Sequence, residues 1–163
     1  MSLGDTNGKY HFYCINVISM KYMLDTNIFN LLLDGRFSLS FLSEVNGVFA
    51  TPIQMEELSK TSDAERRNEL LRIFEDVSPH VFSPSFSWDV PGAGWDDGEW
   101  SEHNDASQLW VALESNKSKL NNWEDALIAE AAMSADCCLV TADRLLAEVA
   151  SRHGISTQYF DCK

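Results

Sequence analysis

The stretch KYMLDTNIFNLLL, residues 21–33, decides the fold class. A short apolar run is followed by Asp25, Thr26 and Asn27, residue types that favour the start of a helix, and then by apolar residues at helical spacing. The stretch therefore predicts a strand over 21–24 that leads directly into a helix. A carboxylate at such a junction lies where parallel α/β sheets carry their functional groups.

The same alternation of strand and helix continues along the chain. Further strands are predicted over 48–50, within 77–102, over 137–141 and over 155–160. Helices are predicted over 39–44, 51–74, 105–115, 122–132 and 143–152. Strands that alternate with helices predict a parallel sheet covered by helices on both faces.

Length and composition predict a single domain. The chain has 163 residues, of which 45% are hydrophobic and 23% charged, as in ordinary globular proteins. No apolar run reaches the length needed to span a membrane. Residues 1–19 are predicted to be an N-terminal extension or an added segment, with an extra edge strand over 12–18 as the alternative, and residues 20–163 to form the domain.

Charge and cysteine content narrow the function classes. A formal net charge of −13 excludes nucleic-acid binding by broad neutralisation of phosphates, so any such contact must be local or mediated by metal. The four cysteines lack the spacing of a zinc module or of a disulfide framework. Cys137 and Cys138 lie within an apolar run, which predicts reduced thiols and a cytoplasmic protein.

Four acidic residues lie at or just beyond the ends of short apolar segments. They are Asp25, Glu57, Asp125 and Asp143. Four carboxylates packed together cannot all stay ionised unless a cation neutralises them, and a hard divalent ion with oxygen ligands is the natural one. The order of the elements permits these acids to meet at one edge of the sheet.

Each acid also has a structural explanation when it is taken singly. Asp25 and Asp143 suit helix N-caps, and Asp125 suits the first turn of a helix capped by Asn122. Glu57 could be a solvated helix residue, because Glu56 beside it offers the same chemistry. A capping role alone would tolerate Ser, Thr or Asn, yet an acid occurs at all four places.

Four short motifs carry a resemblance to a known family. They are LDTNIF at 24–29, Glu57-Leu58 in a helix after a short strand, NWEDALIAEAA at 122–132, and LVTADRLL at 139–146. In this order they resemble the acidic motifs of the PIN-domain nucleases, and most of all the VapC-type toxin ribonucleases of bacterial toxin–antitoxin pairs. The resemblance extends over about residues 21–160.

The resemblance implies a three-layer α/β/α sandwich with a central, mostly parallel sheet, and a metal-dependent endoribonuclease that hydrolyses RNA with an activated water. It implies that the four acids are the catalytic residues and the Mg²⁺ or Mn²⁺ ligands, supported by polar neighbours at Thr26, Asn27 and Thr141. Arg144 is expected either to make a surface ion pair or to contact the scissile phosphate. Expected partners are RNA, a small antitoxin protein and a second copy of the chain.

The chain departs from the compact family pattern in a Trp/Gly-rich insertion at about 84–102. Its tryptophans, Trp88, Trp95 and Trp100, could stack on bases, but the acids among them favour packing against the domain or a protein partner.

Two alternatives from other classes remain open. One is a non-catalytic PIN-like domain that binds protein or RNA. The other is a small-ligand-binding α/β domain in which the acids only cap helices, although a Gly-rich phosphate loop after the first strand is missing.

Overall fold

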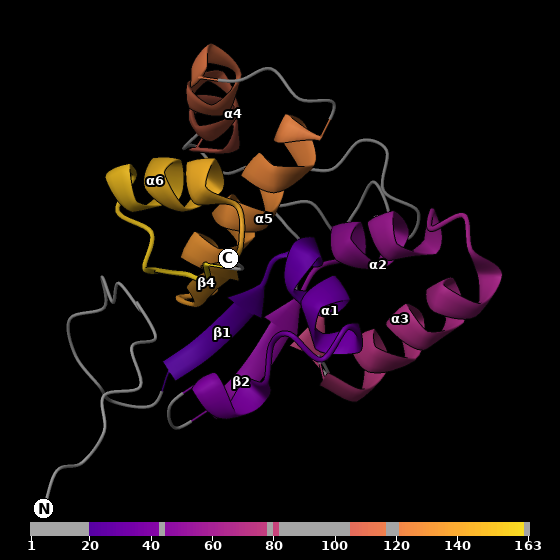
Figure 1. Ribbon diagram of the computed structural model, residues 1–163. Coiled ribbons are helices and arrows are strands. Elements are labelled where there is room, and N and C mark those ends of the chain that lie inside the picture. The colour runs from indigo at the N-terminus through magenta and orange to yellow at the C-terminus, as the bar shows by residue number, and fades with distance from the viewer. Residues whose placement is uncertain (1–19, 43–44, 78–79, 82–104, 117–120, 162–163) are drawn as a thin grey trace, which may run out of the picture.

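The computed structural model describes residues 20–42, 45–77, 80–81, 105–116 and 121–161, and in it strands alternate with helices along the chain (Figure 1). The strands are β1 (Met20–Leu24), β2 (Val45–Ala50), β3 (His80–Val81), β4 (Cys138–Thr141) and β5 (Thr157–Tyr159). The helices are α1 (Thr26–Leu33), the 3₁₀ turn η1 (Leu39–Phe41), α2 (Pro52–Ser59), α3 (Ala64–Val77), α4 (Asp105–Asn116), α5 (Asn122–Ser134) and α6 (Arg144–Arg152).

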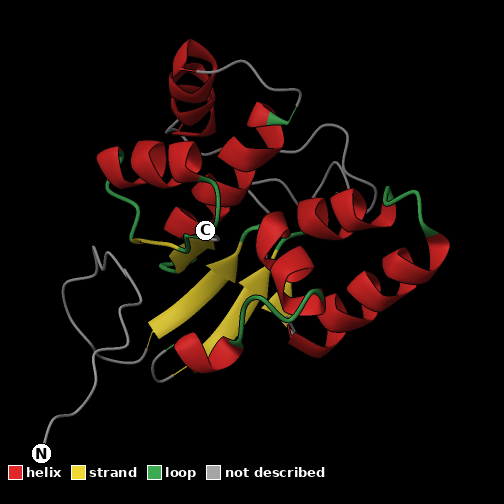
Figure 2. Ribbon diagram, in the orientation of Figure 1, coloured by secondary structure: helices red, strands yellow, loops and turns green. Residues whose placement is uncertain are grey.

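The five strands form one parallel sheet in the order β3-β2-β1-β4-β5. Strand β1 is central and pairs with both β2 and β4, so that Tyr22 lies opposite Val48 on one side and Cys138 on the other. Parallel strands need crossover connections, which helices supply here. Figure 2 shows the helices packed around this sheet, so the predicted α/β/α architecture is confirmed.

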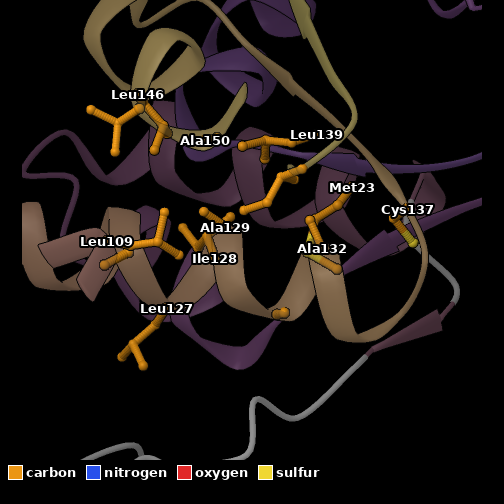
Figure 3. Close-up of a cluster of buried hydrophobic side chains, with 14 of the residues drawn as sticks. Met23, Leu109, Leu127, Ile128, Ala129, Ala132, Cys137, Leu139, Leu146 and Ala150 are labelled. Carbon is orange, nitrogen blue, oxygen red and sulfur yellow. The ribbon is translucent and has the colours of Figure 1, made fainter. Parts of the chain in front are cut away.

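Alternating side chains of the central strands fill two separate cores. Met23 and Leu139 point to the face covered by α4, α5 and α6, where they pack with Leu109, Ile128 and Leu146 (Figure 3). Tyr22, Leu24, Cys138 and Val140 point to the opposite face, covered by α1 and α3, where Phe29 packs against Phe74. This alternation follows from the two-residue period of a strand. Because both faces are buried, the sequence of each central strand is almost continuously apolar.

The prediction of one continuous helix over 51–74 is wrong, because the structure has two helices there. Helix α2 ends at Ser59 with Lys60 as its C-cap, and α3 begins after Asp63, whose side chain accepts a hydrogen bond from Arg66 N at 2.8 Å. The intervening Thr61, Ser62 and Asp63 are better at capping helices than at continuing them. The polar residues 60–63 could equally lie on the solvated face of one continuous helix, since Leu58 before them and Leu70 after them pack in the same core.

Two smaller predictions also need correction. The helix predicted over 39–44 is only the three-residue turn η1 in the described part of the chain. The residue before α5 is Asn121 rather than the predicted cap Asn122, which lies inside the helix and is buried.

Residues 1–19 and the Trp/Gly-rich insertion at 84–102 lie outside the described residues, as do the strand predicted over 12–18 and Trp88, Trp95 and Trp100. None of the helices in the described segments combines the length and the apolar character needed to cross a membrane.

Candidate active site

Asp25 directly follows β1, the strand at which the order of strand addition in the sheet reverses. From β1 the chain passes to β2 on one side of the sheet, whereas β4 pairs with β1 on the other side. The Asp25 N–H donates to the main-chain oxygen of Val140 at 2.9 Å, which fixes the residue against the end of β4. Only 3% of the surface of Asp25 is exposed. The carboxylate is therefore held at the switch point, where sheets of this kind bind ligands.

Neutral donors surround the Asp25 carboxylate. Its Oδ1 accepts from the N–H of Thr26 at 2.7 Å, as an N-cap of α1, and its Oδ2 accepts from Thr141 Oγ1 at 2.6 Å and Asn27 Nδ2 at 2.5 Å. Asn27 is in turn oriented by the N–H of Ala142, which donates to its Oδ1 at 3.0 Å. These bonds join the start of α1 to the end of β4 and set the orientation of the carboxylate.

Glu57, on α2, lies beside this group. Thr26 Oγ1 donates to Glu57 Oε2, and the side chain of Asn121 also donates to the Glu57 carboxylate. Glu56 instead makes an ion pair with Lys60, with 2.8 Å between Oε1 and Nζ. Of the two adjacent glutamates, the structure therefore brings Glu57 to Asp25.

Asp143 follows β4 and caps α6. Its Oδ1 accepts from the N–H groups of Leu145 and Leu146 at 2.8 and 3.2 Å, and its own N–H donates to Thr141 Oγ1 at 2.9 Å. The Thr141 hydroxyl thus bridges Asp143 and Asp25. Asp143 therefore both caps α6 and lies at the edge of the candidate site.

The pKa of Asp25 is raised from 3.8 to about 6, mainly by burial. The charges of Glu57 and Asp143 add to this rise, and the hydrogen bonds from Thr141 and Thr26 oppose it. Burial also raises the pKa of Glu57, aided by the charge of Glu124 and opposed first by the hydrogen bond from Thr26. A hydroxyl and a main-chain amide, rather than a cation, are thus the groups that favour ionised Asp25. An acid in this state favours a cation as a ligand.

Helix α5 contributes acids from two adjacent positions. Asp125 is buried, with 6% of its surface exposed, and its N–H donates to Asn121 O at 3.0 Å. Glu124 is the α5 residue whose charge raises the pKa of Glu57, and its Oε2 is buried without a hydrogen-bond partner among the described residues. The motif points to Asp125, and the charge of the adjacent Glu124 acts on Glu57.

Arg144 makes the surface ion pair that was one of its two predicted roles. Its Nε lies 2.9 Å from Glu148 Oε1, one helical turn further along α6, and its side chain is largely exposed. The pair holds the guanidinium on the outer surface of α6.

The carboxylates of Asp25, Glu57 and Asp143 lie near one another, but they do not form a ready-made metal centre. Among the described residues, no three His, Cys, Asp or Glu side chains are arranged so that they could hold a metal ion. The donor chemistry nevertheless fits a hard cation, because the available atoms are carboxylate oxygens, and burial followed by the charges of Glu57 and Asp143 raises the pKa of Asp25. A bound ion would have to draw these side chains closer together.

Solved structures provide the comparison that bears on this arrangement. A chain of the structure of VapBC-1 from nontypeable Haemophilus influenzae matches 86% of this chain and 98% of its own length, with 19% identity and a TM-score of 0.55. The predicted VapC-like PIN fold is confirmed. Chains of VapBC-5 from Mycobacterium tuberculosis and of FitAcB from Neisseria gonorrhoeae match 86% and 88% of this chain and 97% and 98% of their own lengths. Their identities are 19% and 13%, and their TM-scores are 0.48 and 0.45. No protein-family model and no curated protein matches the sequence.

Sequence patterns missed two residues that shape the site within this PIN fold. Gln54 completes a capping box with Thr51, and its Nε2 also donates to Leu24 O at 2.7 Å. Asn121 precedes α5, and its side chain binds Glu57. Two successive asparagines before the acidic helix were the available signal, since only one of them can be the N-cap.

Proposed function

We propose that this chain is a metal-dependent endoribonuclease and the toxin of a toxin–antitoxin pair. The observation that carries the proposal is Asp25, which is buried at the switch point of a VapC-like PIN fold beside Glu57 and Asp143, with a pKa raised to about 6. An ionised acid held in this state is stabilised by a divalent ion, and a divalent ion can supply the Lewis acidity and the activated water that phosphodiester hydrolysis uses.

Asp25, Glu57 and Asp143 are the residues that would hold the ion, and the resemblance adds Asp125 to this set. When bound, Mg²⁺ or Mn²⁺ would supply Lewis acidity towards a phosphate oxygen and lower the pKa of a water molecule. Thr141 and Asn27 keep the Asp25 carboxylate in one orientation through hydrogen bonds of 2.6 and 2.5 Å. Orienting groups of this kind determine how well a ligand set works.

Thr26 has a second positioning role in the proposed mechanism. Its N–H binds Asp25 and its hydroxyl binds Glu57, so one residue sets the relation between acids that come from β1 and α2. Preorganisation of this sort lowers the cost of reaching the reactive geometry.

The proposed partners follow from the proposed role. A small antitoxin would block the acidic site by presenting Arg or Lys to the carboxylates. A cytoplasmic location belongs to the same proposal, because toxins of this type act on cellular RNA. A homodimer is proposed on the basis of the family resemblance. One further observation supports metal-mediated contact with RNA, namely the net charge of −13, which opposes binding through phosphates alone.

The alternative is a non-catalytic PIN-like domain that acts as a protein- or RNA-binding module. It is favoured by the finding that no three acidic side chains among the described residues stand ready to hold a metal. In that case the hydrogen bonds around Asp25 would serve the stability of the α1 start and nothing more.

Calorimetric titration of Mn²⁺, combined with RNA cleavage assays on the same samples, separates these functions. Wild-type protein, Asp25→Asn and Glu56→Gln should be compared, the last as a matched control because Glu56 pairs with Lys60 away from the site. We expect binding and Mg²⁺-dependent cleavage in the wild type and in Glu56→Gln, and loss of both in Asp25→Asn. No metal binding by the wild type would overturn the nuclease proposal and favour the binding module.

A further inference from the structure

Two tryptophans form an exposed pair where α4 meets the start of α5. The rings of Trp110 and Trp123 lie edge to face, with centroids 6.1 Å apart and planes at 89°. They are 40% and 37% exposed, although tryptophan is normally well buried. Nearby, Asn122 Nδ2 donates to Glu114 Oε1 at 2.7 Å and ties the two helices together. The pair is thus a fixed aromatic surface in contact with solvent.

The Trp pair lies next to the candidate active site. Trp123 is the second residue of α5, and the residues on both sides of Asn122-Trp123 reach Glu57: Asn121 through a hydrogen bond and Glu124 through its charge. Consecutive Cα atoms are only about 3.8 Å apart, so the main chain of Trp123 is close to that of Asn121 and of Glu124. The Trp pair therefore lies at the same end of α5 as the groups that act on Glu57.

The charge of the protein indicates what such a surface can bind. With a net charge of −13, the chain cannot gain much affinity for RNA from its phosphates. Base stacking on an aromatic ring needs no charge neutralisation and accepts every base. An exposed ring pair beside the acids is therefore a source of RNA affinity that the charge does not oppose.

The size of the surface also distinguishes a base from a protein. With 40% and 37% exposed, two rings of about 250 Å² each present roughly 200 Å². Each partner in a stable protein interface contributes about 800 Å². The other large apolar side chains that are exposed in the described residues lie on separate elements or point elsewhere: Phe41, Met55 and Val111.

We propose that Trp110 and Trp123 form a stacking platform for an unpaired base of single-stranded RNA next to the scissile phosphate. The inference rests on the proposed ribonuclease function and deepens it, because it names two residues that would bind the substrate. A base in a duplex has no free face, so the platform selects unpaired RNA.

The test is binding of fluorescein-labelled RNA, measured by anisotropy in the presence of a chelator, where cleavage does not interfere. Wild type, Trp123→Ala, Trp123→Phe and Trp110→Ala should be compared. Val111→Ala is the matched control, because Val111 is 58% exposed on the same helix but points away from Trp110, one residue earlier. Melting curves establish that each variant is folded.

We expect Trp123→Ala to weaken binding of single-stranded RNA by about tenfold or more, Trp123→Phe to retain much of the affinity, and Val111→Ala to change little. Duplex RNA should bind weakly, and affinity should depend little on salt. With Mg²⁺ present, Trp123→Ala should raise KM more than it lowers kcat.

Unchanged RNA affinity in a folded Trp123→Ala variant would overturn the proposal and leave the pair as part of a protein interface. Absence of RNA binding by the wild type, or equal affinity for duplex, would also overturn it. Failure of the ribonuclease proposal is distinguishable, since the wild type would then bind RNA in chelator through the Trp pair yet cut nothing in Mg²⁺.

Discussion

Gln54 joins the helix that carries Glu57 to the strand that ends before Asp25. Its Nε2 donates to Leu24 O at 2.7 Å, while its Oε1 accepts from the N–H of Thr51. Gln54 is fully buried, and so both bonds are made without competition from water. Gln54 thereby holds α2 against the end of β1 and, together with Thr26, fixes the position of Glu57 relative to Asp25.

Replacement of Gln54 by Met should damage both stability and activity. The substitution keeps the volume but leaves Leu24 O and Thr51 N–H unpaired in the interior, which should cost about 1–3 kcal/mol in the free energy of unfolding. Denaturant unfolding measures this loss. RNA cleavage should fall more than the folded fraction alone explains, because Glu57 is no longer fixed relative to Asp25. Met55→Ala, at the exposed neighbouring position, serves as the control and should change neither quantity appreciably.

The pH dependence of stability should reveal the raised pKa of Asp25. In the folded protein Asp25 holds its proton up to about pH 6, whereas its ordinary pKa is 3.8. Between these values the folded state binds more protons than the unfolded state, so stability falls as pH rises from 3.8 to 6 and is constant above. The total loss from this residue is about 3 kcal/mol.

Asp25→Asn should remove that pH dependence. In metal-free buffer, unfolding free energies measured from pH 4 to pH 7.5 should fall more steeply in the wild type than in the variant. Addition of Mn²⁺ at pH 7.5 should raise the melting temperature of the wild type and leave the variant unchanged. If the free energy of unfolding depended on pH in the same way in both proteins, the raised pKa of Asp25 would be contradicted.

Glu57 and Glu56 should differ sharply in their contribution to activity. Glu57→Gln removes a carboxylate that lies beside Asp25, and we expect cleavage to fall by more than about a hundredfold. Glu56→Gln breaks only the surface pair with Lys60 and should leave the rate nearly unchanged. Single-turnover cleavage at saturating Mg²⁺ measures both. Equal effects would mean that α2 presents a different face to the substrate.

Substitutions at Glu124 and Asp125 test which of these two adjacent α5 residues is the third acid of the site. Glu124→Gln removes a charge near Glu57 and should weaken Mn²⁺ binding by about tenfold, as calorimetry would measure. Asp125→Asn should abolish cleavage if the family's third acid is carried over to this position. Full activity of Asp125→Asn together with inactivity of Glu124→Gln would assign the third acid to Glu124.

Thr141 should act through the Asp25 carboxylate. Thr141→Val keeps the shape of the side chain but removes the hydroxyl that donates to Asp25 and accepts from Asp143 N–H. We expect metal affinity to fall by about 10- to 100-fold, with recovery in Thr141→Ser. Calorimetric titration of Mn²⁺ into all three proteins tests this, and unaltered affinity in Thr141→Val would rule out a positioning role.

The order of elements could be predicted because each strand and helix of the site has a strong local signal. Asp25 directly follows an apolar strand, and the residues after it have capping types and helical spacing, so its place as N-cap of α1 was accessible from sequence. The same holds for Asp143 and α6.

The break between α2 and α3 was not predicted, because the polar residues Lys60–Asp63 also fit the solvated face of one continuous helix, and only their capping preferences mark the boundary. The relation of Glu57 to Thr26 depends on packing between α1 and α2 rather than on either segment. The same is true of Trp110 and Trp123, which become neighbours only when α4 packs on α5.

Thr141 binds Asp25 across 116 residues of sequence, and Asp143 follows shortly after it. Strand β1 stands at the centre of the sheet, and its neighbour β4 is made only after the more than one hundred residues that separate them. During synthesis, Asp25 therefore stays without its Thr141 and Asn27–Ala142 framework until residues 138–143 can pair with β1. A growing polypeptide can therefore complete this site only after residues 138–143 have been made.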